Sequence, residues 1–342
     1  MPTLRVALLV ALALPQAVPA QWVYTNTGAS ELRGLSVADK NTIWASGARG
    51  WFVLSTDGGF VWKADTVRGA TGLDFRSISA INNRVAFIAS AGEAEKGQAT
   101  IMSTGSSGAS WAQEYATRDT GVFIDALESW NPRNWVALSD PTKGAFTLIM
   151  SSDGKTWRRL PPDNLPRVLP GEAAFAASGT SLVVRGKSEM WIGTGGGGKA
   201  RVMHSPDAGA TWSVAETPVH ADGASSGIFG LAFFDSVRGV AVGGDYLKRT
   251  LAAVSVALTT DGGKTWRAAK APPAAFLSGV AYAGSPAKLV AVGLAGTFTS
   301  ADSGDTWTQV DSIALNPVKV LGANGWAVGP RGRVARWNAK SP

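Results

Sequence analysis

A short segment that ends in tryptophan recurs along the chain and constrains its fold more than any other feature. Four copies follow the pattern Ser/Thr-x-Asp-x-Gly-x-x-Trp: "STDGGFVW" ends at Trp62, "SPDAGATW" at Trp212, "TTDGGKTW" at Trp266 and "SADSGDTW" at Trp307. Two copies vary: "SSDGKTW", ending at Trp157, is one residue shorter, and "TGSSGASW", ending at Trp111, has serine for aspartate. Successive tryptophans are 49, 46, 55, 54 and 41 residues apart. Spacing of this size predicts a repeat architecture.

Between these boxes, the chain has the pattern of short β-strands. The fifth unit contains "GIFGLAFFD", "SVRGVAVGG" and "AAVSVALTT", then a box, then "TWRAAK". Each apolar segment is short, rich in β-branched residues and bounded by Gly, Asp, Pro or Ser, and no stretch after residue 20 has a sustained helical period. Four antiparallel strands per unit, repeated, predict the blades of an all-β propeller.

The two ends of the chain predict how the ring closes. After the box at Trp307 only three strands follow, whereas a lone strand, "QWVYTN", precedes the first unit. Pairing of 22–25 with 333–337 would complete a seventh blade and remove an open sheet edge. The 322 residues after position 20 then form one domain, 21–342, with 46 residues per blade. The expected blades are approximately 31–66, 74–116, 121–160, 173–218, 227–270, 276–311, and 313–337 with 21–25.

The composition of the box favours a structural role over a catalytic one. Its aspartate can accept hydrogen bonds from backbone N–H groups of its own turn, and glycine at the fifth position suits a positive φ. Its tryptophan supplies a large apolar body to pack between blades. We therefore predict a structural hairpin between the third and fourth strands of each blade, with these aspartates and tryptophans as its key residues: Asp57, Trp62, Asp153, Trp157, Asp207, Trp212, Asp261, Trp266, Asp302 and Trp307.

The box resembles the Asp-box (BNR) repeat of sialidases, xyloglucanases, sortilin-type receptors and the photosystem II stability/assembly factor family. The flanking segments "LRGLSVADKNTIWASGARGWFVLSTDGGFVW" and "GWAVGPRGRVARW" look most like the assembly-factor family. That resemblance covers everything after residue 20 and implies a single, exported, seven-bladed propeller whose boxes lie at the blade periphery. In that family an arginine-rich patch on one face binds the partner. Relatives also occur outside photosynthesis, so the resemblance carries no photosynthetic role with it.

The first twenty residues, "MPTLRVALLVALALPQAVPA", have the layout of a secretory signal peptide. Arg5 is followed by a short apolar run and then by Val18-Pro19-Ala20, a small-residue cleavage sequence. We expect cleavage after Ala20 and export to the periplasm or the extracellular space. The net charge of +7 favours anionic partners, but Lys and Arg are scattered singly, which argues against nucleic acid as a partner.

We expect neither a cofactor nor a metal. "GTGGGGK", residues 193–199, has the glycine spacing of a dinucleotide loop, but the segments on both sides read as strands, and a dinucleotide loop must open a helix. Two histidines and no cysteine make a zinc site improbable.

The face opposite the boxes is where the repeats stop agreeing, so we expect function there. It is formed by the loops that enter each first strand and those that join the second and third strands. The candidate binding residues on these loops are Arg33, Arg76, Arg118, Tyr246, Lys248 and Arg249. The candidate catalytic carboxylates are Asp125, Asp140, Glu172 and Asp245.

Two functions are compatible with this face. The first is a non-enzymatic module, monomeric, that holds a protein or peptide partner, including a segment of a membrane protein. The alternative is a glycoside hydrolase or carbohydrate-binding propeller, since hydrolysis needs two carboxyl groups at a defined separation. The sialidase pattern is absent, and xyloglucanases of this repeat type use two propellers. The sequence therefore favours the binding module over an enzyme.

Overall fold

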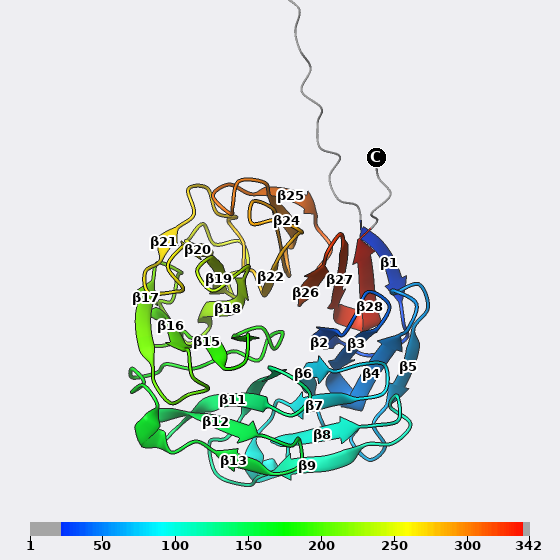
Figure 1. The fold of residues 1–342 in the computed structure, drawn as a ribbon. Coiled ribbons are helices and arrows are strands. Elements are labelled where there is room, and N and C mark those ends of the chain that lie inside the picture. Colours follow the sequence, from blue (N-terminus) through cyan, green and yellow to red (C-terminus); the bar gives the residue numbers. More distant parts are fainter. Residues whose placement is uncertain (1–21, 338–342) are drawn as a thin grey trace, which may run out of the picture.

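The computed structural model describes residues 22–337, in which seven four-stranded antiparallel sheets form a ring (Figure 1). This is the predicted all-β, seven-bladed propeller. The predicted signal peptide, residues 1–20, lies outside the described residues. No helix between residues 22 and 337 has the length and apolar character needed to cross a membrane.

Six blades each take four consecutive strands. Blade 1 consists of β2 (Leu32–Val37), β3 (Ile43–Gly47), β4 (Trp51–Ser55) and β5 (Lys63–Thr66). Blade 2 consists of β6 (Phe75–Ala80), β7 (Ala86–Ser90), β8 (Thr100–Thr104) and β9 (Ala112–Ala116). Blade 3 consists of β10 (Ile124–Ser129), β11 (Trp135–Thr142), β12 (Ala145–Ser151) and β13 (Trp157–Arg159). Blade 4 consists of β14 (Leu182–Arg185), β15 (Glu189–Gly193), β16 (Ala200–Ser205) and β17 (Ser213–Thr217). Blade 5 consists of β18 (Ser226–Phe233), β19 (Gly239–Asp245), β20 (Val256–Thr259) and β21 (Arg267–Ala268). Blade 6 consists of β22 (Gly279–Tyr282), β23 (Leu289–Gly293), β24 (Gly296–Ser300) and β25 (Thr308–Asp311). Short 3₁₀ turns are η1 (Ala48–Gly50), η2 (Ala94–Lys96), η3 (Pro162–Asn164) and η4 (Pro330–Gly332).

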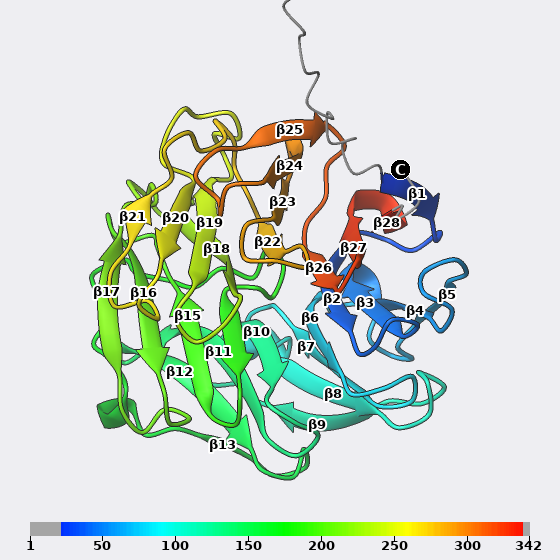
Figure 2. The same ribbon diagram turned by 45° about the horizontal axis from the view of Figure 1, so that its top comes forward.

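The seventh blade is closed by the first strand, as predicted. It consists of β26 (Val318–Leu321), β27 (Asn324–Gly329), β28 (Arg333–Trp337) and β1 (Trp22–Asn26). β1 runs antiparallel along β28, with Trp22 opposite Trp337, and Figures 1 and 2 show the blue strand beside the red one. The Trp22 indole N–H also donates to the Thr297 hydroxyl of blade 6, at 3.0 Å. The closing strand is therefore held by its own sheet and by the neighbouring blade.

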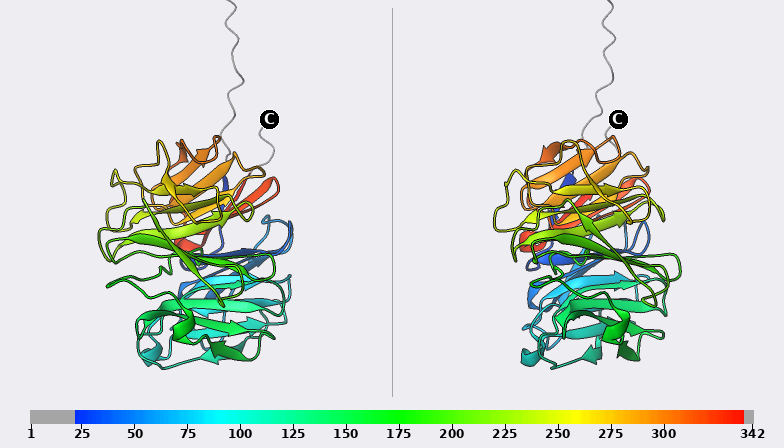
Figure 3. Two further views of the ribbon diagram at one scale, coloured as in Figure 1. Left: turned by 60° about the vertical axis from the view of Figure 1, so that its left-hand side comes forward. Right: turned by 90° about the vertical axis from the view of Figure 1, so that its left-hand side faces the viewer.

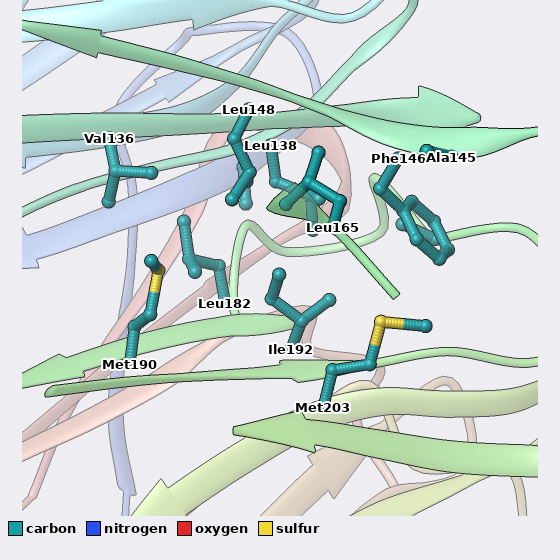
Figure 4. Close-up of a cluster of buried hydrophobic side chains, with 12 residues drawn as sticks. Val136, Leu138, Ala145, Phe146, Leu148, Leu165, Leu182, Met190, Ile192 and Met203 are labelled. Carbon is teal, nitrogen blue, oxygen red and sulfur yellow. The ribbon is translucent and has the colours of Figure 1, made fainter. Parts of the chain in front are cut away.

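The core lies between blades rather than within them, because its clusters join buried residues of adjacent blades. Figure 3 shows the sheets stacked one beside the next. The cluster between blades 3 and 4, which includes Leu138, Leu148, Leu182 and Ile192, is typical (Figure 4). Four second-strand tryptophans are fully buried in this core: Trp44, Trp135, Trp191 and Trp326.

Three of these tryptophans also tie adjacent blades together by hydrogen bonds. The indole N–H of Trp191 donates to the Gly262 carbonyl of blade 5, and that of Trp326 to the Gly58 carbonyl of blade 1, both at 2.9 Å. Trp44 donates to the Asn82 carbonyl of blade 2 at 3.0 Å. Each of these buried N–H groups therefore finds its hydrogen-bond acceptor in the neighbouring blade, so the packing of one blade depends on the position of the other.

Each box joins the third strand of its blade to the fourth. In blade 5 the Thr259 hydroxyl accepts the Gly263 N–H at 3.0 Å, and the Asp261 carboxylate accepts the Thr265 N–H at 3.0 Å. Gly263 has a φ of +90°, which favours glycine, and its carbonyl accepts the Trp266 indole N–H at 3.1 Å. Hydrogen bonds from the Thr265 hydroxyl, at 2.6 Å, and then from the Thr265 N–H lower the pKa of Asp261 to about 2. The hydroxyl, the carboxylate and the indole N–H of the box are thus all hydrogen-bonded within the box, which supports a structural role over a catalytic one.

Blade 4 departs from the repeat. We expected it to begin at residue 173, but its first strand begins at Leu182, and residues 173–181 form what we call the central loop. The sequence of this loop, "AAFAASGTS", consists almost entirely of small residues, which fit where seven strands converge. A green loop reaches into the middle of the ring in Figure 1.

The central loop is tied to blades on several sides of the ring. The Ser178 hydroxyl donates to the Ser278 carbonyl of blade 6 at 2.6 Å, and the Thr180 hydroxyl to the Phe229 carbonyl of blade 5 at 3.3 Å. From blade 1, the Arg33 guanidinium donates to a carbonyl of the loop at 3.4 Å. The loop therefore occupies the centre of the propeller as part of the packed structure.

Candidate binding site

A pocket of about 730 Å³ opens at the centre of the predicted loop face. It is larger than the hollows of about 460 to 550 Å³ elsewhere on the described surface, and residues from all seven blades line it. Its lining comes from the loops that enter the first strands and from those that follow the second strands, as expected. We call it the central pocket.

Six blades each contribute one residue from the same position, at or just before the start of the innermost strand. In sequence this residue stands between an apolar residue and a small one or proline, as in "LRG", "FRS", "IDA", "IFG", "LSG" and "LNP". We call these the entry residues, and all of them line the pocket: Arg33, Arg76, Asp125, Phe229, Ser278 and Asn316.

β-Bulges aim several of these side chains. The register of the first strand shifts at Arg33, Arg76, Asp125 and Phe229, so that one extra residue stands there against the second strand. A bulge re-aims a side chain without breaking the sheet and is common beside functional sites. A second bulge, at Asp140 in β11, brings another carboxyl to the same pocket. Local backbone geometry thus selects which residues face the pocket.

The wall formed by blades 1 to 3 is charged. Two arginines there are already paired within their own blades: Arg33 with Glu31 at 2.8 Å, and Arg76 with Asp74 at 2.7 Å. The remaining carboxyl groups on this wall are Asp125 and Asp140. Asp140 accepts the Ala174 N–H of the central loop at 3.0 Å.

The wall formed by blades 4 to 6 is aromatic. Phe175 of the central loop stacks on Phe229 with ring centroids 4.0 Å apart, and Phe276 packs edge-on against Phe229 at 4.7 Å. At the rim, Tyr246 packs edge-on against Phe229 at 6.1 Å, and Leu247 is 72% exposed. The pocket is therefore divided into a charged half and an apolar half.

Burial changes the acidity of the two pocket carboxyls. Burial raises the pKa of Asp140 to about 6, although the Ala174 N–H opposes it. Burial, followed by the nearby charge of Asp140, raises the pKa of Asp125 well above its ordinary value, while the Arg76 charge opposes this rise. Carboxyl groups with raised pKa values that face a pocket are candidates for a functional site.

The structure brings six of the ten candidate residues into the central pocket: Arg33, Arg76, Asp125, Asp140, Tyr246 and Arg249. Arg118 is exposed on blade 2, where it donates to the Glu95 carbonyl at 3.3 Å. Asp245 accepts the Leu247 N–H at 3.0 Å and lies 3.8 Å from the Lys248 ammonium, so these two residues order the blade 5 loop.

The fourth candidate outside the pocket, Glu172, lies beside the central loop in a buried ion pair. Its carboxylate accepts hydrogen bonds from Arg201 at 2.8 Å, from the Thr194 hydroxyl at 2.6 Å and from the Leu169 N–H at 2.8 Å. With every oxygen occupied and the side chain inaccessible, Glu172 holds the base of the central loop.

Sequence reasoning missed the phenylalanines of the pocket, Phe123, Phe175, Phe229 and Phe276, and also Leu247, Ser278 and Asn316. Phenylalanines beside an apolar strand resemble core, whereas all the sequence candidates except Tyr246 carry a charge. The entry-residue pattern is the signal that would have found Phe229, since aligning "IFG" with "IDA" places it at the position of Asp125.

Among the residues from 22 to 337, no group of three or more His, Asp or Glu side chains is placed to hold a metal ion. The segment 193–199, with its dinucleotide-like spacing, connects β15 to β16 and opens no helix.

Comparison with known proteins supports the fold. The sequence matches no family model and no curated protein. The structure is similar to that of YCF48 bound to a D1 peptide, with a TM-score of 0.66, 17% identity, and coverage of 95% of this chain and 98% of that chain. It is also similar to YCF48 from Cyanidioschyzon merolae (TM-score 0.65, 15% identity, 93% and 99% coverage) and to the WD40 β-propeller domain of Doa1 (0.64, 10%, 95% and 99%). At these identities the likeness establishes a seven-bladed β-propeller, and it agrees with the expected resemblance to photosystem II assembly factors.

Proposed function

We propose that this chain is an exported, non-enzymatic and monomeric module that holds a peptide segment of a protein partner in its central pocket. The observation that carries the proposal is the divided pocket, which offers an aromatic wall for apolar side chains and a charged wall for polar ones. A solved neighbour of the same fold is bound to a D1 peptide. The boxes, by their sequence, are proposed to be Asp-boxes of the BNR type.

An extended peptide suits this site better than a small ligand. The pocket is open, and its apolar lining continues onto the exposed rim at Tyr246 and Leu247. Apolar side chains that stay exposed beside a pocket indicate a surface that a partner covers.

Selection of peptides from a random display library tests the proposal. The rim variant Leu247→Glu should weaken binding of the selected peptides at least tenfold, because it places a charge on an apolar contact. Val61→Glu is the matched control: Val61 is 69% exposed, compared with 72% for Leu247, but lies in a box outside the pocket. Failure to select any peptide, or equal loss of binding in both variants, would contradict the proposal.

Export is proposed from the first twenty residues alone. Expression of the full chain in a bacterial host should yield a periplasmic or secreted protein that begins at Gln21, which N-terminal mass analysis would detect. A protein that retains residues 1–20 would count against export.

Glycoside hydrolysis is a second candidate, favoured by the presence of Asp125 and Asp140 in one pocket with raised pKa values. Turnover of aryl glycosides that disappears in Asp125→Asn would establish the hydrolase and replace the binding module.

A further inference from the structure

Asp125 is an unusual carboxyl group for a folded protein. It is an entry residue, 1% exposed, and its Oδ2 atom has no hydrogen-bond partner among the described residues. Buried polar atoms are almost always paired, and a buried carboxyl oxygen left alone is costly. Because Asp125 lines the central pocket, a ligand group in the pocket is placed to supply the missing partner.

The charges around Asp125 indicate the sign of that group. The nearest guanidinium groups are engaged: Arg33 pairs with Glu31, and Arg76 donates to Asp74 and, at 3.5 Å, to a carbonyl of the central loop. The one other cation in the pocket lining, Arg249, belongs to the blade 5 rim. On the wall of blades 1 to 3, the carboxyl groups that are not in ion pairs are therefore Asp125 and Asp140, and this part of the pocket attracts positive charge.

We propose that Asp125 and Asp140 form a subsite for the cationic side chain of a bound peptide, the ammonium group of lysine or the guanidinium group of arginine. An apolar residue next to this cation packs against the aromatic wall of Phe175, Phe229 and Phe276. The inference rests on the proposed function and deepens it, because it names the chemistry that the pocket selects.

Binding of a cation at the subsite should change the protonation of Asp125 and Asp140. Glu31, Arg33, Asp74, Arg76 and Arg249 are the other charged groups at the pocket, and Asp140 lies close enough to Asp125 to raise its pKa. Burial and the nearby charge of Asp140 raise the pKa of Asp125, and burial raises the pKa of Asp140 to about 6, so the empty pocket favours the protonated form of both carboxyls more than water does. A bound cation favours the ionised form of both, so cation binding releases protons from the pair.

The composition of peptides selected by display tests the subsite. Wild-type protein should enrich Lys or Arg beside an apolar residue at least threefold over the input library, even though its net charge of +7 repels basic peptides. The isosteric double variant Asp125→Asn with Asp140→Asn should still select peptides, but without basic enrichment. Asp163→Asn, which changes an exposed carboxylate outside the pocket, should behave as wild type.

Affinity measurements on one selected peptide complete the test. Replacement of its basic residue by norleucine should weaken binding at least tenfold for the wild type and less than twofold for the double variant. Calorimetry in two buffers of different ionisation enthalpy should show net proton release on binding to the wild type and none with the double variant.

The outcomes separate the two proposals. Peptides selected without basic enrichment, or an enrichment that survives in the double variant, would overturn the cation subsite and leave the binding module standing. Failure to select any peptide would overturn both. Loss of all binding by a double variant whose unfolding midpoint is no lower than that of the wild type would also overturn the subsite, because the aromatic wall should still bind.

Discussion

The Ser178 hydroxyl donates a 2.6 Å hydrogen bond to the main-chain carbonyl of Ser278, one hundred residues further along the chain. Ser278 is an entry residue of the pocket and also donates, at 2.7 Å, to the Asn316 carbonyl. The central loop is thus joined to the ring of residues that line the binding site. Its stability and the shape of the pocket depend on the same contacts.

Gly179, at the tip of this loop, should not tolerate a side chain. Its φ is +68°, and a Cβ atom there would lie 2.7 Å from the Ser77 hydroxyl oxygen. Gly186 has a similar φ of +60° but open space around it. We expect Gly186→Ala to cost about 1 kcal/mol from backbone strain alone and Gly179→Ala about 1–3 kcal/mol more. Urea unfolding measures both, and equal costs would show that the loop is not packed against blade 2.

The Glu172–Arg201 ion pair should be essential to the loop. Glu172→Gln leaves the Arg201 guanidinium buried without a counter-charge and is expected to cost about 3–5 kcal/mol. Glu216→Gln, in the exposed pair with Lys199, should cost less than about 1 kcal/mol.

A double variant separates the charge effect from packing. Glu172→Gln combined with Arg201→Met removes both charges, so it should recover part of the stability lost in Glu172→Gln alone. If the double variant is the less stable of the two, the uncompensated charge is not the cause of the loss.

The pKa of Asp140 predicts a stability change with pH. Folding raises this pKa from 3.8 to about 6, so the fold favours the protonated form. Its stabilising contribution is therefore complete below pH 3.8 and is lost as the pH rises through 6. Asp140→Asn cannot ionise and should gain on the order of 1–2 kcal/mol over the wild type at pH 8 but little at pH 4. Unfolding midpoints at both values measure the gain, and a pH-independent difference would refute the assignment.

The variant box of blade 2 should be improvable. Ser106 stands where other boxes have aspartate, and the buried indole N–H of Trp111 has no hydrogen-bond partner among residues 22–337. Ser107 nevertheless has a φ of +57°, close to the +55° of Ala208 in the blade 4 box, so the backbone can hold the missing carboxylate. Ser106→Asp should add about 0.5–1.5 kcal/mol, and Asp57→Ser should remove a similar amount. Thermal unfolding tests both, and destabilisation by Ser106→Asp would be the contrary result.

The repeated parts of the molecule were predictable because their physics is local. A box contains its own hydrogen-bond partners, so "TTDGGKTW" specifies a hairpin without knowledge of the rest of the chain. Counting boxes then predicts the blades, and an unpaired strand at each end predicts the closure between β1 and β28.

The site was predictable only in part, because its chemistry depends on distant contacts. Residue type and loop position selected Asp125 and Glu172 equally, but Arg201 neutralises Glu172, whereas no cation forms a hydrogen bond with Asp125. The sequence around Phe229 resembles that of a core residue, and only the bulge in β18 shows that this side chain lines the pocket. The sequence did not predict the central loop, because its small residues are equally compatible with the first strand of a blade.

The pairing of β1 with β28 also determines when, during synthesis of the chain, the ring of blades can close. The strand made first, Trp22–Asn26, has its partner in Arg333–Trp337, among the strands made last. During synthesis, the strands of blades 1 to 6 are all made before β28, so the ring still has a gap when those blades are complete. The gap closes only when the far end of the chain has emerged. The central pocket, which residues from all seven blades line, is therefore complete only once the last strand has been made.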